Sequence, residues 1–208
     1  MASTSLQNNQ TYNRLPGRFA LSGRALTTIA NPDGGKPGLV ISEMAHLGKL
    51  NLRGGTDMLA TIKSHTGCKI LPANNRFETV GDRQLIWLGP DEFLLLCEAG
   101  RERELRAELM LGFDGIHAAV TNVTDSLCAL NLRGPALRRV LAKGCALDLH
   151  PSKFAAGHAA QTLLSHAAIT LLAIDQDKFT LICRTSFAPY VADWLEDAAL
   201  EFGVAFRA

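Results

Sequence analysis

Apolar and polar residues alternate in two stretches of the chain that carry the same five residues, Leu-Asn-Leu-Arg-Gly, at 50–54 and 130–134. In each copy the two leucines fall on one face of a strand, and the asparagine and arginine fall on the other. The glycine then interrupts the strand. A five-residue word written twice predicts a repeated structural unit.

The segments that follow the two copies come in the same order. Apolar residues recur at helical spacing in TDMLATIKSH (56–65) and again after Pro135, which we place at the first helical position. A strand pair follows, RQLIWLG and EFLLLC in one unit, AITLLAI and KFTLIC in the other. Helices close both units, RERELRAELML (101–111) and a segment from about Ser186, the predicted N-cap. The sequence predicts an α/β (α+β) fold of duplicated strand–helix–strand–strand–helix units with pseudo-twofold symmetry.

A turn-rich stretch, NPDGGKPG (31–38), divides the chain. We assign 1–37 to an N-terminal arm and 38–208 to one domain, with a first half at about 38–114 and a second at about 115–208. Each half is too small to bury enough surface alone, so the two are expected to share a core. The arm's first 32 residues hold arginines and no acid, a composition typical of transit peptides. They show no cleavage signal or amphipathic period. We expect the arm to contact a partner subunit, with a disordered tail as the alternative; its arginines are Arg14, Arg18 and Arg24.

Composition narrows the function classes. Of the 208 residues 47% are apolar and 20% charged, as in globular proteins, and a net charge of +1 gives no sign of nucleic-acid binding. No apolar run reaches the length that crosses a bilayer. The five cysteines form no CxxC pair, which excludes zinc ribbons and thioredoxin-like redox motifs, and we expect reduced thiols in a cytoplasmic protein. They are Cys68, Cys97, Cys128, Cys145 and Cys183.

Few residues are arranged for catalysis or metal binding. The chain has no nucleotide-binding glycine motif, no HExxH and no GxSxG. The histidines are not spaced as metal ligands. Cys145 and His150 are the one nucleophile–base candidate, but the corresponding Cys68 has no histidine after it, so we expect a buried thiol. The six histidines are His46, His65, His117, His150, His158 and His166.

The acidic and aromatic residues have structural interpretations. Three aspartates fall in hairpin turns, where the side chain bonds to the backbone: Asp91, Asp175 and Asp177. Three acids lie on the polar side of the last helix and are expected to be solvated: Asp193, Glu196 and Asp197. Both tryptophans, Trp87 and Trp194, are expected in the core. We assign no catalytic, cofactor-binding or metal-binding residue to this chain.

Five segments carry a family resemblance: WLGPDEFLLL (87–96), TDSLCALNLRGP (124–135), VLAKGCALDLHPSKF (140–154), QTLLSHA (161–167) and RTSFAPYVADWLEDAALEFG (184–203). Together they resemble the gamma-subunit family of heterotetrameric sarcosine oxidases. The third segment with the tryptophan-containing helix is the most specific part, and the arm matches nothing. The resemblance implies a fold similar to the folate-binding domain of the glycine-cleavage aminomethyltransferases.

The resemblance also implies a context, a flavoenzyme complex that oxidatively demethylates sarcosine to glycine. It yields hydrogen peroxide with formaldehyde or 5,10-methylenetetrahydrofolate. In that family the beta subunit carries FAD, the alpha subunit carries NAD and tetrahydrofolate, FMN lies between them, and the delta subunit binds zinc. The gamma subunit packs against alpha and has no assigned catalytic role. We therefore expect a non-catalytic assembly subunit in the cytoplasm.

One departure from the wider family supports this expectation. The aminomethyltransferases place an acidic pair in the strand region that matches LLSHAAITLLAI, whereas residues 165–170 here contain no carboxylate. One-carbon transfer needs a positioned acid–base group. Two alternatives remain. One is a gamma-type subunit of a sister complex that acts on N-methylglutamate or dimethylglycine. The other is a free-standing folate-binding protein or transferase.

Overall fold

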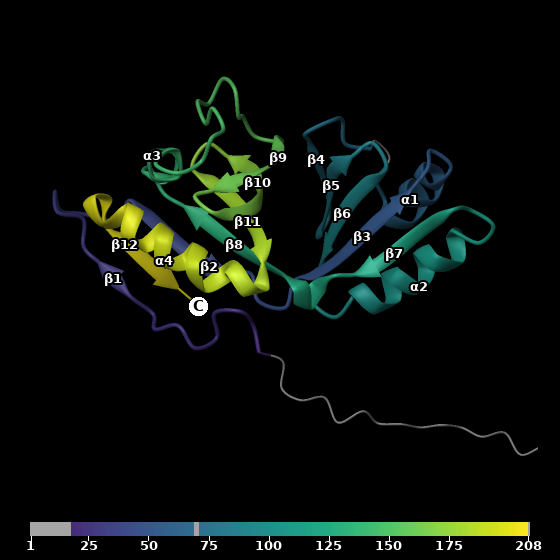
Figure 1. Ribbon diagram of the computed structural model, residues 1–208, viewed down its shortest axis with the longest axis horizontal. Helices are drawn as coiled ribbons and strands as arrows, with labels where there is room; N and C mark the ends of the chain where they lie inside the picture. The colour runs from purple at the N-terminus through teal and green to yellow at the C-terminus, as the bar shows by residue number, and fades with distance from the viewer. Residues whose placement is uncertain (1–17, 69–70, 208) are drawn as a thin grey trace, which may run out of the picture.

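The computed structural model describes residues 18–68 and 71–207. Two β-sheets face each other at the centre of the molecule, and the helices cover their outer faces (Figure 1). Helices α1 (Met58–Thr66) and α2 (Glu102–Gly112) cover one sheet. Helices α3 (Leu137–Ala142) and α4 (Ala188–Ala199) cover the other. The order of layers is helix, sheet, sheet, helix.

The smaller sheet has five strands in the order β4-β5-β6-β3-β7, all antiparallel to their neighbours. Its strands are β3 (Gly48–Gly54), β4 (Phe77–Val80), β5 (Arg83–Gly89), β6 (Glu92–Cys97) and β7 (Ala118–Asn122).

The larger sheet has seven strands in the order β1-β12-β2-β8-β11-β10-β9, and only β12 and β2 run parallel. Its strands are β1 (Thr28–Ile29), β2 (Leu39–Glu43), β8 (Leu127–Arg133), β9 (Ala159–Leu164), β10 (Ala167–Asp175), β11 (Lys178–Arg184) and β12 (Val204–Arg207).

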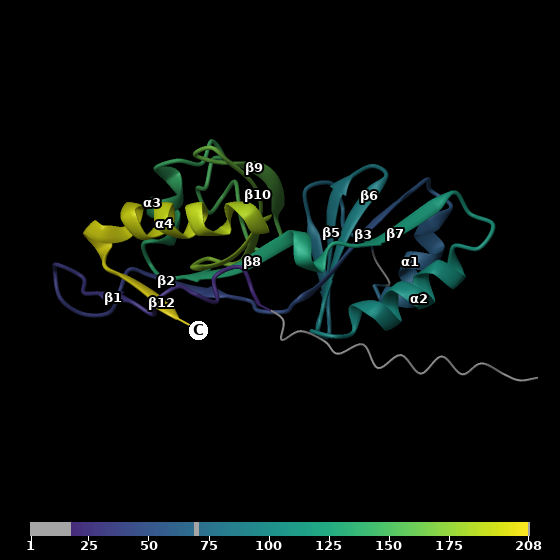
Figure 2. The same cartoon turned by 60° about the horizontal axis from the view of Figure 1, so that its bottom comes forward.

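The two sheets share a four-strand order. The series β4-β5-β6-β3 in one corresponds to β9-β10-β11-β8 in the other, and the repeated pentapeptide lies in β3 and β8. Each pentapeptide strand has a second neighbour, on its other side, and this neighbour comes from the other half of the chain. β2 pairs with β8, and β7 pairs with β3. The chain therefore crosses between the sheets twice, in β2–β3 and β7–β8, at the centre of the molecule (Figures 1 and 2). The boundary at 114/115 does not coincide with the division into sheets, and the twofold relation of the halves stays a prediction.

The alternation in the pentapeptide decides which side chains are buried. Leu50, Leu52, Leu130 and Leu132 are fully buried on the helix-covered faces of their sheets. The arginine of each copy is exposed. The glycines end both copies, as expected, but in different conformations: Gly134 has φ +138°, whereas Gly54 lies outside the left-handed region.

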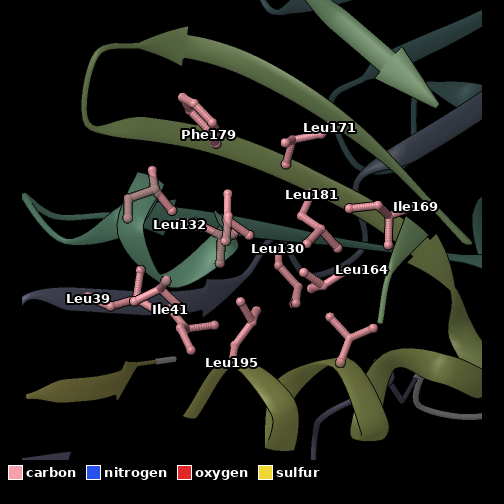
Figure 3. Close-up of a cluster of buried hydrophobic side chains, with 14 of the residues drawn as sticks. Leu39, Ile41, Leu130, Leu132, Leu164, Ile169, Leu171, Phe179, Leu181 and Leu195 are labelled. Atoms are coloured by element: carbon pink, nitrogen blue, oxygen red, sulfur yellow. The ribbon is translucent and has the colours of Figure 1, made fainter. Parts of the chain in front are cut away.

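Three hydrophobic cores hold the layers together. One lies between the larger sheet and helices α3 and α4, and Figure 3 shows side chains of β2, β8, β10 and β11 directed toward Leu195 of α4. A second lies under α1 and α2. The third lies between the two sheets and includes Ile86 and Leu94 from one and Leu172 and Ile182 from the other. This shared core joins the halves.

Two helix starts differ from the prediction. Ser186 does not cap α4, because a 3₁₀ turn over Thr185–Phe187 precedes it, and Phe187 occupies the cap position without a side-chain hydrogen bond. Pro189 falls in the first turn of that helix, where its missing N–H costs nothing. Pro135 is not the first residue of α3, which begins at Leu137.

No helix in the described part of the chain combines the length and the apolar character that a membrane crossing requires.

Candidate functional site

Cys145 and His150 are not brought together by the fold. The Cys145 side chain is buried, and its backbone N–H donates to Leu141 O at 2.9 Å. The His150 ring is exposed and contacts Ser152 Oγ at 2.8 Å. No hydrogen bond joins the thiol and the imidazole. The buried thiol that the sequence favours is what the structure has at this position.

All five cysteines are free thiols and buried. Cys128 and Cys183 lie directly opposite each other in β8 and β11. The pKa of Cys128 is raised by the neighbouring Cys183 thiol and by burial. Burial likewise raises the pKa of Cys97 to about 11, and the nearby Glu102 carboxylate adds to the effect. The Cys97 and Cys128 thiols therefore stay protonated at neutral pH and have little nucleophilic character.

The Cys97 thiol makes stability depend on pH. The unfolded chain loses the thiol proton near 9.0 and the folded chain near 11, so the folded state binds more protons in between. Stability is therefore lost as the pH rises through this window, by up to about 2 kcal/mol from this group. We expect Cys97→Ala to show a shallower fall in unfolding free energy over the same window, measured by urea denaturation. Val140→Ala, which opens a cavity without removing a titrating group, should keep the wild-type slope. Equal slopes in Cys97→Ala and the wild type would contradict the assignment.

The histidines are dispersed. His46 forms the turn before β3, His65 lies on α1, and His158 contacts Arg76 across the sheet interface at 3.1 Å. Within residues 18–68 and 71–207, no three His, Cys, Asp or Glu side chains are grouped as metal ligands.

The two tryptophans pack against the cores. Trp87 on β5 contacts the core under α1 and α2, and Trp194 on α4 contacts the core of the larger sheet. The Trp194 ring lies against Gly144, where a Cβ atom would approach Cζ2 to 2.4 Å. Neither ring lies in a pocket lining described below.

The turn aspartates lie where the sequence predicts. Asp91 lies between β5 and β6, Asp175 ends β10, and Asp177 follows in the turn before β11. The Asp175 carboxylate accepts a hydrogen bond from the backbone N–H of Gln176 at 2.7 Å. The region without a carboxylate, 165–170, forms the β9–β10 turn and the start of β10; Ser165 Oγ accepts from Tyr190 Oη at 2.9 Å.

Part of the arm binds the chain's own last helix. Arg24 donates to Asp193 Oδ1 at 2.5 Å and to Glu196 Oε2, and its guanidinium lies over the Phe206 ring. The prediction of a solvated side chain is therefore wrong for Glu196, which is largely covered in its ion pair. Asp193 stays 70% exposed beside Arg24, and Asp197 is exposed as predicted. Arg18 lines the pocket described below, and Arg14 lies outside the described residues.

Removing the Arg24 anchor should loosen the arm. We expect Arg24→Met to lower the unfolding free energy by about 1 kcal/mol, because the lost ion pairs are partly exposed. Thermolysin, which cuts before apolar residues, should also cleave faster at Leu26 and Ile29 in the arm. Lys36→Met, an exposed residue of the same segment, serves as the control. Identical cleavage rates in the two variants would show that the Arg24 contacts do not hold the arm.

Among the pockets found in the described part of the chain, the one lined by the largest number of charged residues lies at the crossover of the two halves. We call it the crossover pocket. Its volume is about 590 Å³. The start of β3, the start of β8, the first turn of α2 and the beginning of the described arm all contribute to it. The polar and charged lining residues are Arg18, Glu43, His46, Lys49, Glu102, Arg103, Thr124, Asp125, Cys128 and Thr185.

Lys49 is the most deeply buried charged residue of the crossover pocket, with 3% of its surface exposed. Its Nζ donates to Leu47 O at 2.8 Å and to Thr124 O at 3.4 Å. Burial lowers the pKa of Lys49, an effect that the nearby Glu43 carboxylate opposes. A buried lysine is rare and marks candidate binding sites.

Two glutamates of the same pocket differ in how they are satisfied. Glu43 accepts backbone hydrogen bonds from Ala20 and Leu21 at 3.0 and 2.9 Å, which holds the arm against β2. Glu102 Oε2, in contrast, is buried without a hydrogen-bond partner among the described residues. The first glutamate is structural. The second leaves an acceptor open.

The sequence reasoning did not select Lys49, Glu43 or Glu102. Lys49 precedes the first pentapeptide copy, and Ala129 holds the same place before the second. This difference between the copies was the available signal, because a lysine where the repeat has alanine suggests a role that the architecture does not require.

The sarcosine oxidase, gamma subunit family model matches residues 54–201 of this chain. Sarcosine oxidase subunit gamma of Corynebacterium sp. (strain U-96) is 29% identical to it over 211 aligned positions. These cover 99% of this chain and 98% of the relative. The sequence match thus extends over nearly the full length of both proteins.

Solved structures agree with the sequence match. A chain of the heterotetrameric sarcosine oxidase from Corynebacterium sp. U-96, in complex with pyrrole 2-carboxylate, superposes with a TM-score of 0.80 at 27% identity. The superposition covers 89% of this chain and 96% of that one. Glycine cleavage system aminomethyltransferase T from Bartonella henselae shares the fold, with a TM-score of 0.59 at 17% identity over 91% of this chain and 54% of that one. With the family model spanning most of its length, this chain belongs to the sarcosine oxidase gamma subunit family.

Proposed function

We propose that this chain is the gamma subunit of a heterotetrameric sarcosine oxidase, where it serves assembly and carries no catalytic residue. The observation that carries the proposal is the near full-length match, in sequence and in structure, to the gamma subunit and to a chain of such a complex. A shared fold alone would not do this, because one fold serves many functions.

Two features of the chain support a non-catalytic role. The one nucleophile–base candidate, Cys145 with His150, has no connecting hydrogen bond, and the buried thiols of Cys97 and Cys128 have raised pKa values. Residues 165–170, where the related transferases have an acidic pair, offer a serine and a histidine in a turn.

The surface supports a role in assembly. Met110 and Leu111, neighbours at the end of α2, are 51% and 80% exposed. Adjacent apolar side chains in water are unfavourable, and a partner subunit would cover them. From the family resemblance we infer that alpha is the main contact and that beta and delta complete the complex. We assign FAD, FMN, NAD, tetrahydrofolate and zinc to these subunits, and the five free thiols suit the cytoplasm.

Co-expression of a tagged full chain with the alpha, beta and delta genes of its source tests the proposal. We expect the chain to carry down the three companions as a yellow complex that oxidises sarcosine. Omitting this chain should reduce the yield of assembled complex and leave the KM of the remainder for sarcosine unchanged. A chain that elutes alone from these co-expressions overturns the proposal.

The substrate of the complex is tested separately. Sarcosine, dimethylglycine and N-methylglutamate should be compared on the assembled complex by kcat/KM. We expect sarcosine to be preferred. A preference for one of the other amines would move the chain to a sister complex, because the amine site lies in another subunit.

A further inference from the structure

Two cysteines of the larger sheet lie side by side although they are far apart in the sequence. Cys128 on β8 and Cys183 on β11 are direct partners in the antiparallel ladder. Side chains that pair in this way point to the same face of a sheet. Here that face is covered by α3 and α4, and both cysteines belong to the core beneath these helices. The fold therefore places two free thiols next to each other.

Backbone hydrogen bonds fix the spacing of the two strands at this point. In the same register, the Gly134 N–H donates to Asp177 O at 3.0 Å, so these two residues form a hydrogen-bonded pair. Such pairs alternate along an antiparallel ladder with pairs that exchange no hydrogen bond. Cys128 is an even number of positions from Gly134, so Cys128 and Cys183 also form a hydrogen-bonded pair. The Cα atoms of such a pair are about 5.5 Å apart.

This spacing fits a disulfide in its Cα distance and nearly fits one in its Cβ distance. Disulfides join Cα atoms that are about 4.4–6.8 Å apart and Cβ atoms that are about 3.5–4.5 Å apart. Opposite Cβ atoms in a ladder are about 4.5–5.5 Å apart, so the two strands must close locally by up to about 1 Å. A bond formed under such strain is easily reduced, which is typical of reversible disulfides rather than structural ones.

Cys128 is the thiol of the pair that small molecules reach first. It keeps 3% of its surface exposed and lines the crossover pocket, where its thiol donates to Oε1 of Glu43 at 3.5 Å. Cys183 is 2% exposed and is not among the described residues that line the pocket. A small oxidant in the pocket therefore meets Cys128, with Cys183 directly behind it.

The other three cysteines have no cysteine opposite them in the described part of the chain. Cys97 lies opposite Gly48 in its ladder, and Cys145 forms a bridge with Leu164. Cys68 follows α1 in a segment that belongs to no strand. These three thiols serve as internal controls for the pair.

We propose that Cys128 and Cys183 form a reversible disulfide when the chain meets hydrogen peroxide. Cys128 Sγ attacks one peroxide oxygen, the O–O bond breaks, and a sulfenic acid forms while the thiol proton leaves with the other oxygen as water. Cys183 Sγ then attacks the Cys128 sulfur and the S–O bond breaks. The departing hydroxide takes the Cys183 proton and forms a second water. Two electrons pass from the two sulfurs to the peroxide.

The acidity of the two thiols agrees with this order of steps. The neighbouring Cys128 thiol lowers the pKa of Cys183, and burial opposes this effect. Cys183 is therefore the thiol that more readily gives the thiolate needed for the second attack. The raised pKa of Cys128 makes the first attack slow. We expect the pair to respond to sustained exposure to peroxide rather than to a brief pulse.

Peptide mapping of the purified full chain tests the inference. The chain is reduced with dithiothreitol, freed of the reductant, exposed to millimolar hydrogen peroxide and denatured with N-ethylmaleimide, which blocks free thiols before they exchange. We expect a cross-linked peptide pair that contains Cys128 and Cys183 and is lighter by two hydrogen atoms. It should be at least about tenfold more abundant than any other cysteine pair. Dithiothreitol added after the exposure should remove the cross-link.

Single substitutions separate the roles of the two thiols. In Cys183→Ala the sulfenic acid at Cys128 finds no second thiol, so its labelling by dimedone should rise about tenfold over the wild type. In Cys128→Ala, Cys183 should stay unmodified. Cys145→Ala removes a buried thiol that has no cysteine opposite it, and this matched control should form the cross-link in wild-type yield.

The wild-type map decides the question even where a variant does not fold. Five free thiols after the exposure, oxidation of Cys128 that stops at an oxygen acid, or a cross-link between other cysteines each overturns the inference. The inference goes beyond the proposed assembly role and does not rest on it. A chain that forms the disulfide but joins no complex overturns only the assembly proposal.

Discussion

Gly134→Ala is expected to lower the unfolding free energy of the chain by about 3 kcal/mol or more. Gly134 has φ +138°, a conformation that residues with a Cβ atom rarely adopt, and the new Cβ would lie 2.2 Å from Gly38 O. Both obstacles involve backbone, so no side chain can rotate away. Gly38 O also accepts the Ala136 N–H at 3.0 Å, so moving it would disturb the start of α3.

Urea denaturation followed by circular dichroism measures this loss, and the thermal midpoint should fall by about 6–12 °C. Gly23→Ala is the control, because no atom lies within 4 Å of its Cβ position. Gly54→Ala tests the first copy: its Cβ would lie 2.7 Å from the Ala118 Cβ, without the positive φ. We expect an intermediate loss there. Equal midpoints for Gly134→Ala and Gly23→Ala would refute the importance of the close approach.

The sequence predicted the elements whose side chains repeat with a clear period. Strands β3, β8, β5, β6, β10 and β11 alternate or form apolar runs, and helices α1, α2 and α4 have an apolar stripe. The strands without a prediction are short or largely exposed. β7 has one buried residue, Val120, and β9 buries only its ends, Ala159 and Leu164. Their position in a sheet comes from hydrogen bonding to neighbours, which local sequence does not encode.

The sequence also could not predict that a strand from one half of the chain pairs with a strand from the other half, and the reason is related. β2 pairs with β8 and lies beside β12, so its partners come from the second half and the chain's end. Alternation tells which face of a strand is buried but not which strand lies next to it. The cap at Ser186 failed because the 3₁₀ turn at Thr185–Phe187 takes its place.

The burial of the charged groups in the crossover pocket could not be predicted from the local sequence either. Lys49 lies in a strand whose alternation of apolar and polar residues places it on the polar face. The sequence therefore predicts that its side chain is exposed to solvent. It is buried because the β7–β8 crossover passes over it, with Thr124 accepting from its ammonium. Glu102 looks like an ordinary acid in the first turn of a helix. Only the missing side chain of Gly48 brings its carboxylate inside.

The second large effect is expected from Phe179→Ala, at about 3–5 kcal/mol of unfolding free energy. Phe179 on β11 is fully buried in the core that Figure 3 shows. Its ring meets Phe154 edge to face at a centroid distance of 5.7 Å, and the Arg138 guanidinium lies 4.8 Å from its centroid. The substitution therefore removes a large apolar contact and a support of Arg138.

Arg138 extends the consequence to the chain segment after α3. Its Nη1 donates to Leu149 O at 2.6 Å and to Phe154 O at 3.0 Å, so the ring and the arginine together hold this segment on the sheet. We expect Phe179→Ala to speed hydrogen exchange around 149–154 as well as to lower the urea midpoint. Phe179→Leu should lose about 1 kcal/mol, since most of the volume stays. Phe187→Ala, at an exposed position, should change neither measurement. A Phe179→Ala variant as stable as Phe187→Ala would mean that this core can close over the missing ring, and the segment after α3 would then be held by Arg138 alone.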